Sequence, residues 1–510
     1  MIRPDFDEFV RLAAAGTLVP VSREILFDTD TAVTAYAKLA RGGGARQRFG
    51  FLLESVVGGE KWARYTFVGV EPREAWRLEP GGCISTWRPE SGWTPPEAVN
   101  DPLADLERRL TAHSPVPSPG LPRFYGGAVG YLGYDIARPG RPPATGPADA
   151  LALPEALLLF TDVVLAIDNL FGRAHAIATV EVGDADGVDE LRERYDAAVE
   201  KLDATLRRLR DAPAPAPITL EPAPEEDPPF RSSYERHAFE EDVRRIQARI
   251  EAGEVRQVVL SQRLTVPLEA DPFDLYRALR SLNPSPYLYF LELDGVTLVG
   301  SSPEVLVRVE DGRVTVRPIA GTRPRGRNEE EDAALAAELL ADAKEIAEHE
   351  MLVELGREDV GRVAVPGTVR TSEHMTVERY SHVLHLVSQV EGDLRDGLTA
   401  VDAFRACFPA GTVSGAPRER AMEIIDELEP VRRGPYAGAV GYFAYGGRAM
   451  DTAIAIRTLV AKDGAAHVQA GAGIVADSVP ELEYRETLAK ARALLRVLGM
   501  VRPGTGPTRG

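Results

Sequence analysis

Four glutamates in two pairs have the residue type and spacing to bind a metal ion. Glu345 and Glu348 lie in "AKEIAEHE", and Glu483 and Glu486 lie in "ELEYRET". A spacing of i, i+3 places each pair on one helical face, where two like charges repel unless a cation or solvent relieves them. A hard cation such as Mg²⁺ takes oxygen ligands and keeps waters that a substrate can replace. Taken alone, either pair is more simply a solvated helix face.

Two glycine-containing loops could hold an anion. In "QAGAGIVADS", residues 469–478, small residues at a strand end let backbone N–H groups approach an oxyanion closely. In "FPAGTVSGAPRERAM", residues 408–422, a loop that leads into a helix offers the hydroxyls of Thr412 and Ser414 and free helix amides. The simpler alternatives are a bulge or close packing for the first loop and an ordinary capped helix start for the second.

Two single residues could also take part in chemistry. Arg457 ends the apolar run "DTAIAIRTL", where a buried guanidinium needs a carboxylate partner, either from a ligand or from one of the protein's own acids. His385 in "SHVLHLVSQVEG" lies on a strand pattern and is either a general acid or base or a structural histidine. Cys407 is most simply a small buried hydrophobe.

Composition limits the class of protein. The chain has 510 residues, a formal net charge of −19 and no sustained Lys/Arg run, so we expect neither nucleic acid nor an anionic membrane as a partner. Only two cysteines are present, and they are far apart, which excludes a disulfide framework and indicates a cytoplasmic protein. There is no signal-peptide pattern and no run of 18 apolar residues.

The elements that must position these residues form an α+β pattern. A Pro/Ala-rich linker at 211–230 separates a first part, 1–210, from a second, 231–500, and a tail at 501–510 is expected to be disordered. Short turns between the strand candidates of the second part indicate antiparallel hairpins. A long helix is expected at about 329–356 and a closing helix from Pro480. We therefore predict largely antiparallel sheets with helices outside them.

Taken together, the motifs resemble a known family, the chorismate-utilising enzymes, and within it the anthranilate synthases. The resemblance runs nearly the whole chain through "FLLESVVGGEKWARYTFVG", "LNPSPYLYFL", "GSSPEVLVRV", "RPIAGTRPRG", "AEHEMLVELGR", "YSHVLHLVSQVEG", "FPAGTVSGAP" and "GAGIVADSVPELEYRET". It implies a layered sandwich of two largely antiparallel sheets. It also implies conversion of chorismate and ammonia to anthranilate and pyruvate, the first step from chorismate toward tryptophan.

The resemblance assigns roles to particular residues. Glu348 and Glu486 would hold Mg²⁺, with Glu345 and Glu483 as water-mediated or alternative ligands. Glu304 corresponds to a general acid toward the departing C4 hydroxyl, and His385 and Thr412 match positions linked to the later loss of pyruvate. The substrate carboxylates and ring would be held by Gly321, Thr322, Tyr436, Arg457, Gly471, Ala472, Gly473 and Lys490.

Two positions imply the nucleophile. Relatives that add water have a lysine where this chain has Gln257, and aminodeoxychorismate synthases have a nucleophilic lysine where it has Ala320. With neither lysine present, ammonia fits, delivered from glutamine by a separate amidotransferase subunit. The family pattern is changed at Glu354 and Glu358, where relatives have Asp and Asn, which puts the geometry near the metal helix in question.

The first part resembles the family's regulatory region. Glu54 and Ser55 in "LLES", with Pro286, Tyr287 and Leu288 in "NPSPYL", match a tryptophan site, although Leu288 stands where Met is common. Feedback by tryptophan would couple two distinct sites; the alternative is that these segments only pack. Two other functions remain open, an aminodeoxyisochorismate synthase that stops before pyruvate loss and a non-catalytic tryptophan-sensing scaffold.

Overall fold

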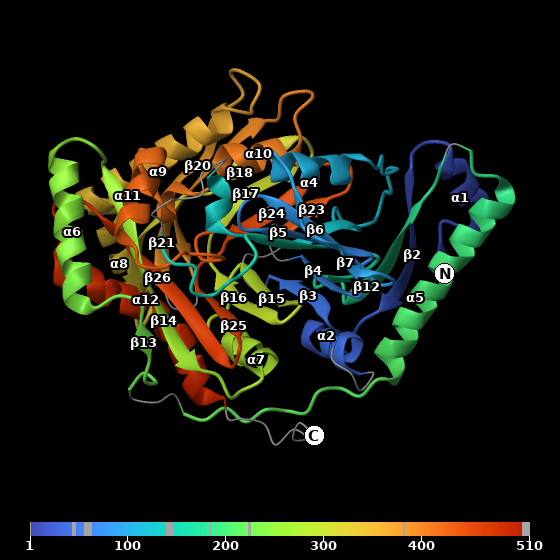
Figure 1. Cartoon of the computed structure of the whole chain (residues 1–510), viewed down its shortest axis with the longest axis horizontal. Coiled ribbons are helices and arrows are strands. Elements are labelled where there is room, and N and C mark those ends of the chain that lie inside the picture. The colour runs from blue at the N-terminus through green and yellow to red at the C-terminus, as the bar shows by residue number, and fades with distance from the viewer. Residues whose placement is uncertain are drawn as a thin grey trace.

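The structure is a computed structural model that describes residues 2–42, 47–55, 64–138, 147–183, 185–222, 226–380 and 383–501. Apart from Val501, the tail predicted to be disordered lies outside these residues. Two large sheets face each other with helices on their outer sides (Figure 1). The strand pairings within the described residues are antiparallel, which confirms the predicted α+β sandwich.

The first sheet joins strands from both ends of the chain. Its strands, in order across the sheet, are β1 (Ile2–Arg3), β2 (Leu18–Leu26), β12 (Arg173–Glu181), β11 (Val163–Asp168), β4 (Tyr65–Val70), β3 (Phe49–Glu54), β15 (Tyr287–Leu293), β16 (Val296–Ser302), β25 (Thr458–Lys462), β26 (Ala465–Ile474), β14 (Gln257–Pro267) and β13 (Arg231–Ser232), with β22 (Gly415–Ala416) beside β14.

The second sheet is also built from distant segments. Its strands, in order, are β19 (Ile319–Pro324), β21 (Val383–Asp393), β18 (Arg313–Val316), β17 (Val305–Glu310), β24 (Met450–Ile454), β23 (Ala439–Ala444), β9 (Gly127–Leu132), β10 (Ala156–Phe160), β5 (Glu74–Glu79), β6 (Cys83–Arg88) and β7 (Gly92–Trp93), with β20 (Arg370–Arg379) beside β21 and β8 (Glu97–Ala98) beside β6.

Helices cover the outer faces of both sheets. They are α1 (Phe6–Ala13), α2 (Ala32–Arg41), α4 (Pro102–Thr111), α5 (Val188–Asp211), α6 (Arg236–Glu251), α7 (Pro272–Leu282), α8 (Glu329–Ala341), α9 (Ala343–Gly361), α10 (Ala400–Cys407), α11 (Arg418–Leu428) and α12 (Pro480–Met500), with short 3₁₀ helices at Tyr134–Ala137 and Gly411–Val413. The helix predicted at 329–356 is two helices, because Asp342 leaves helical geometry and its side chain caps the amides of Lys344 and Glu345. None of the described helices is both long enough and apolar enough to cross a membrane.

The alternation of strand side chains explains the layers. On β15, Tyr289 and Leu291 point into the core between the sheets, whereas Leu288 and Phe290 join the core beneath the outer helices. This strand is therefore apolar on both faces, as a sheet covered on both sides requires.

Both sheets continue across the predicted boundary between the two parts of the chain. β3 from the first part pairs with β15 from the second, and β9 pairs with β23 in the other sheet. The predicted linker follows the end of α5 and runs along the periphery to β13 (Figure 1). The two parts thus share one sandwich, and the regulatory role of the first part remains a prediction.

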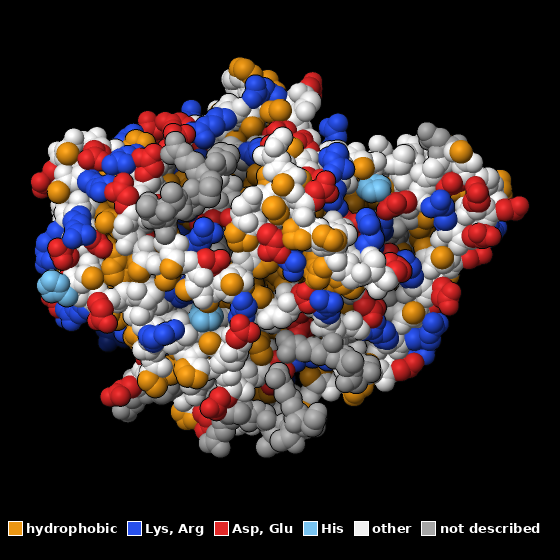
Figure 2. Space-filling view, viewed as in Figure 1, with side chains coloured by type: hydrophobic (Ala, Val, Ile, Leu, Met, Phe, Trp, Pro, Cys, Tyr) orange, Lys and Arg blue, Asp and Glu red, His pale blue; other side chains and the backbone are white. Residues whose placement is uncertain are grey.

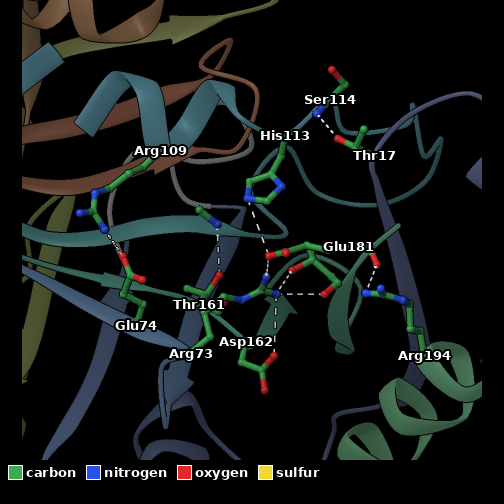
Figure 3. A network of polar contacts seen from close by, with 12 residues as sticks. Thr17, Arg73, Glu74, Arg109, His113, Ser114, Thr161, Asp162, Glu181 and Arg194 are labelled. Carbon is green, nitrogen blue, oxygen red and sulfur yellow. Dashed lines mark hydrogen bonds and ion pairs between the residues drawn. The ribbon is translucent and has the colours of Figure 1, made fainter. Parts of the chain in front are cut away.

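A network of hydrogen bonds and ion pairs connects segments of the two sheets at one end of the molecule (Figure 3). Arg73, in the segment that leads from β4 to β5, donates to the carbonyl oxygens of Thr161 at 3.0 Å and Thr179 at 2.9 Å and pairs with Glu181. The Nε2 atom of His113 lies 3.7 Å from the Oε1 atom of the same glutamate. Because Thr161 follows β10 and Thr179 belongs to β12, this arginine fixes both sheets at one end of the molecule.

On the face seen in Figure 2, acidic and basic side chains are interspersed, with no large basic area.

Candidate active site

Arg457 is a half-buried cation that has no acidic partner among the described residues. Within the described residues its side chain makes no ion pair and no hydrogen bond, and burial lowers the pKa of its guanidinium. Its backbone adopts a left-handed conformation, φ 50°, and its carbonyl oxygen accepts from the Ser301 amide at 3.1 Å. A half-buried arginine with a left-handed backbone and no acidic partner in the described part of the chain is suited to bind an anion from outside the chain. The alternative of an internal acidic partner is not found in the described part of the protein.

Tyr436 and the glycines of β26 form a wall beside this arginine. A Cβ atom on Gly471 would lie 2.7 Å from the Tyr436 hydroxyl oxygen, so the tyrosine is seated directly over the glycine backbone. The Lys490 ammonium on α12 donates to the Gly471 carbonyl oxygen at 3.0 Å. Gly473 lies on the same side of the strand, where a Cβ would come within 2.5 Å of the Gln257 amide nitrogen. Ala472 is fully buried and belongs to the core of the opposite side.

His385 contacts the two predicted substrate residues of β19. Its Nδ1 atom lies 3.0 Å from the Gly321 carbonyl oxygen and 3.2 Å from the Thr322 hydroxyl. Because the carbonyl can only accept, Nδ1 carries the proton of the neutral ring and Nε2 is left as a base. Burial lowers the pKa of His385, and the positive charge of Arg457 acts in the same direction. The imidazole ring of His385 is therefore neutral near pH 7, and its Nε2 atom is free to accept a proton.

Gly321 supplies the bend that this contact needs. Its φ of 63° is in the left-handed region that favours glycine, at a bulge where the pairing of β19 with β21 shifts between Ala320 and Thr322. Ala320 itself is half-buried on this strand.

Glu304 is a buried carboxyl group in the connection between β16 and β17. Burial raises its pKa to about 8, and the Thr412 hydroxyl and Lys490 ammonium partly oppose this rise. Glu304 and Thr412 line one small cavity of about 50 Å³, which also touches Gly411 and Leu355. At neutral pH Glu304 is therefore protonated and can act as a general acid.

The four predicted metal ligands lie on α9 and α12. Burial raises the pKa of Glu348, and the negative charges of Glu345 and Glu486 add to this rise. Burial also raises the pKa of Glu483, with a contribution from Glu486. Glu348 on α9 is therefore influenced by Glu345 on its own helix and by Glu486 on α12, and the assignment of these four residues as metal ligands remains a prediction.

The donor set fits a hard cation by its chemistry, because it offers oxygen atoms only and carries like charges that a cation would relieve. The geometry is not preassembled, since no three described His, Cys, Asp or Glu side chains converge closely enough to hold a metal. Glu486 pairs with Lys490 at 2.8 Å, and Glu345 pairs with Arg323 at 3.2 Å. Glu486 and Glu345 would therefore have to release Lys490 and Arg323 in order to bind Mg²⁺.

The residues predicted to bind tryptophan are brought together on neighbouring strands. Glu54 at the end of β3 lies directly opposite Leu288 on β15. The Glu54 carboxylate is buried and accepts from both Nε and Nη2 of Arg280, at 2.7 Å each, and from the Tyr276 hydroxyl at 2.7 Å.

The neighbouring regulatory residues reach toward the second sheet. Tyr287 follows Pro286 and donates to Asp451 on β24 at 2.9 Å. Ser55 is the last described residue before the gap at 56–63, so the rest of "LLESVVGGEKWA" lies outside the described residues.

Glu354 and Glu358, which depart from the family pattern, are both exposed on α9. Glu354 comes no closer than 4.0 Å to Arg256, its ion-pair partner. Both lie on the solvent face of the helix rather than among the carboxylates, so the longer side chains are accommodated in water.

Sequence reasoning did not find Glu429 and Arg433, a buried ion pair behind Tyr436. Arg433 and its neighbour Arg432 are equivalent in the letters "VRRGPY", but only Arg433 has a fully buried side chain. The spacing of four residues between the acid and the base is the only local signal, and many exposed pairs share it.

Comparison with known proteins gives consistent matches. A model of the chorismate binding enzyme family matches residues 63–496. The chain is 51% identical to anthranilate synthase component 1 of Pseudomonas putida over 497 residues, which cover 97% of this chain and 98% of that protein. It is similar in structure to anthranilate synthase component I of Streptococcus pneumoniae TIGR4, with a TM-score of 0.72 and 38% identity, over 86% of this chain and 94% of that one. The menaquinone-specific isochorismate synthase of Escherichia coli, at 20% identity and a TM-score of 0.68 over 97% of this chain and 98% of that one, shares the fold.

Proposed function

The chain belongs to the chorismate binding enzyme family, and from this premise we propose that it is the large subunit of an anthranilate synthase. It would convert chorismate and ammonia to anthranilate and pyruvate, a lyase reaction on the way to tryptophan. The relatives at 43–51% identity carry the name anthranilate synthase component 1, and they match over nearly their whole length. The single structural observation that carries the proposal is Arg457, a half-buried cation that has no acidic partner among the described residues and lies within the electrostatic influence of Tyr436.

A dianionic substrate suits this arrangement. Arg457 would receive one carboxylate by paired hydrogen bonds, and the backbone of Gly471 and Gly473 lets a second anionic group approach without a side chain in the way. The Tyr436 hydroxyl and the Lys490 ammonium lie at the same glycine. The overall charge of −19 repels anions, so this local cluster of donors is what would bind the substrate.

The first chemical step would be amination at C2 with loss of the C4 hydroxyl. Ammonia adds its electron pair to C2, both double bonds of the ring diene shift by one position, and the C4–O bond breaks; the added nitrogen then releases a proton to solvent and becomes an amine. Glu304, protonated below pH about 8, would give its proton to the departing oxygen so that water leaves. Glu348 and Glu486 would hold Mg²⁺, which when bound would supply Lewis-acid polarisation of the substrate oxygens.

The second step would be loss of pyruvate from C3, which aromatises the ring. The C2 proton must be removed while the C3–O bond of the enolpyruvyl ether breaks. Neutral His385, with Nδ1 bonded to Gly321 and Nε2 unprotonated, has the state of a base. Thr412, beside Glu304, would hold the departing group. The presence of both residues favours anthranilate over the amino intermediate as the product.

The nucleophile is inferred from residues that are absent. Gln257 and Ala320 provide no amine, so ammonia must arrive from elsewhere. The component 1 designation of the relatives implies a second component, and we propose a glutamine amidotransferase subunit as the partner. Tryptophan would inhibit the enzyme at the site formed by β3 and β15, where Glu54 and Leu288 face each other across strands.

Purified protein incubated with chorismate, Mg²⁺ and ammonium at alkaline pH tests the proposal. Anthranilate fluorescence and an equimolar amount of pyruvate are the expected products. A stable amino intermediate without pyruvate would instead identify an aminodeoxyisochorismate synthase. Tryptophan-dependent thermal stabilisation without chorismate turnover would identify the non-catalytic scaffold.

A further inference from the structure

The buried ion pair between Glu429 and Arg433 lies next to several of the segments that line the proposed site. Glu429 and Arg433 flank the turn between α11 and β23, and their side chains are 2% and 1% exposed. Arg433 Nε donates to Glu429 Oε2 at 2.9 Å, and Nη2 donates to Oε1 at 2.6 Å. The contact is therefore a two-pronged guanidinium–carboxylate pair, which fixes both side chains in direction as well as in distance.

The remaining donors of Arg433 hold two other segments of the site. Nη1 donates to the Val413 carbonyl oxygen at 2.7 Å, and Nη2 donates to the Val259 carbonyl oxygen at 2.7 Å. Val413 directly follows Thr412 in the chain. The guanidinium also lies 5.5 Å from the centre of the Tyr436 ring, a cation–π distance. One side chain thus contacts the Thr412 loop, strand β14 and Tyr436.

The carboxylate holds the same strand at a second point. Glu429 Oε1 accepts from the Ser261 amide at 2.8 Å and from the Ser261 hydroxyl at 2.7 Å. Across the β14–β26 ladder, Val259 lies opposite Gly473 and Ser261 lies opposite Gly471. The two anchor points on β14 are therefore the strand partners of the two glycines that form the proposed carboxylate-binding backbone.

We propose that the Glu429–Arg433 ion pair positions the active site by fixing Thr412, Tyr436 and the Gly471–Gly473 backbone relative to one another. Neither residue needs to touch the substrate. This inference rests on the proposed function, because it takes these residues to be the ones that bind chorismate and release pyruvate. A buried ion pair is in itself weak evidence for a stabilising role, which leaves geometric specification as its better explanation here.

Arg433→Lys is the informative variant because it keeps the charge and removes the planar fork. A lysine cannot contact Glu429, Val413 and Val259 in the same directions. Displacement of site groups by about 1 Å lowers catalysis on the order of 100-fold, so we expect kcat/KM per folded enzyme to fall by about that factor. Since Thr412 is associated with the second step, some amino intermediate should be released before it loses pyruvate.

The matched control is Arg109→Lys. Arg109 on α4 is also held by carboxylates, Asp105 at 2.8 Å and Glu74 (Figure 3), and its side chain is 20% exposed, but its partners Asp105, Glu74 and Thr86 are not residues of the proposed site. We expect its kcat and KM to stay within twofold of the wild type.

Chemical rescue separates positioning from stability. In Arg433→Ala, guanidinium at low millimolar concentration should restore activity about tenfold or more, whereas methylammonium should not, because only guanidinium has the planar fork. If Arg433→Ala does not fold, the kcat/KM of folded Arg433→Lys relative to the wild type tests the proposal without the rescue experiment. Circular dichroism and thermal unfolding measure the folded fraction in each case.

The outcomes are distinct. Arg433→Lys with normal kcat and KM per folded enzyme, even at reduced yield, would overturn the inference, because a structural role alone predicts that result. If the wild type makes no anthranilate, the proposed function fails instead. Calorimetric titration with chorismate then still tests positioning, with weaker binding expected for Arg433→Lys and unchanged binding contradicting it.

Discussion

The Tyr436 hydroxyl lies directly over the backbone of Gly471, where a Cβ atom would stand 2.7 Å from the hydroxyl oxygen and 3.0 Å from the Leu260 carbonyl oxygen. A glycine at position 471 is required by this close approach and not by its backbone angles, since its φ is not in the left-handed region.

Gly471→Ala should therefore displace Tyr436 and block the approach of a substrate carboxylate. We expect kcat/KM for chorismate to fall on the order of 100-fold while the circular dichroism spectrum stays the same. Gly361→Ala is the control, because a Cβ at that position in α9 meets no atom within 4 Å. Equal activity of the two variants would show that Gly471 does not line the site.

Arg457→Gln should abolish chorismate binding and at the same time stabilise the protein. A buried cation without a counter-charge costs folding free energy, so its removal should raise the free energy of unfolding by roughly 1 kcal/mol. Arg308 is the contrasting case, because its Nε atom lies 3.5 Å from a carboxylate oxygen of the half-buried Asp451. Arg308→Gln should destabilise by roughly 1–3 kcal/mol. Denaturant unfolding and calorimetric titration with chorismate measure both effects, and a destabilised Arg457→Gln would point to an internal partner.

Glu304 gives the enzyme a pH dependence on its basic side. Below a pKa of about 8 the carboxyl group is protonated and can donate, so kcat/KM normalised to free ammonia should decline as pH rises through that value. Glu304→Gln should lower the rate by about 10²- to 10⁴-fold and remove this decline. A pH profile that is unchanged in Glu304→Gln would assign the acid to another residue.

The same carboxyl group affects stability. Its pKa is 4.5 in the unfolded chain and about 8 in the folded protein, so the folded state holds the extra proton between these values. Stability contributed by this group is present below pH 4.5 and is lost as pH rises toward 8, by up to about 1.4 kcal/mol per pH unit. Glu304→Gln should flatten the dependence of the unfolding free energy on pH over that range.

Glu348→Gln and Glu486→Gln should weaken Mg²⁺ binding by on the order of 10- to 100-fold. In the absence of Mg²⁺, Glu348→Gln should raise the melting temperature, because it removes a carboxylate whose pKa is raised by Glu345 and Glu486. Glu354→Gln, exposed on the outer face of the same helix, serves as control. Calorimetry with MgCl₂ and thermal unfolding with and without EDTA provide readouts besides activity; normal Mg²⁺ affinity in Glu486→Gln would contradict the ligand assignment.

Ser55→Ala should relieve tryptophan inhibition without lowering turnover. The neighbouring Glu54 already accepts hydrogen bonds from Arg280, and Ser55 directly after β3 is half-buried. Inhibition curves at fixed chorismate, with tryptophan-dependent thermal shift as a binding readout, measure the effect. If tryptophan inhibits Ser55→Ala as strongly as the wild type, the segments at β3 and β15 serve only as packing.

The ordered motifs implied the sandwich through their resemblance to the chorismate-utilising enzymes, and the residue patterns alone predicted largely antiparallel sheets with outer helices and the helical carboxylate pairs. These follow from local geometry: a spacing of three residues fixes a shared helix face, and alternation along a strand fixes which side chains share a layer. The same local reasoning missed the break at Asp342, because the capping bonds of its side chain interrupt an otherwise continuous helical pattern.

Only the tertiary structure decided the state of the site residues. Among the described residues Arg457 has no acidic partner, whereas Arg433 is paired with Glu429, although both are arginines in short loops before a strand. Glu304 holds its proton because segments far away in the chain exclude water from it. The physical reason is that charge pairing and desolvation depend on which distant groups arrive within a few ångströms, whereas helix faces and strand alternation depend on the chain's own repeat.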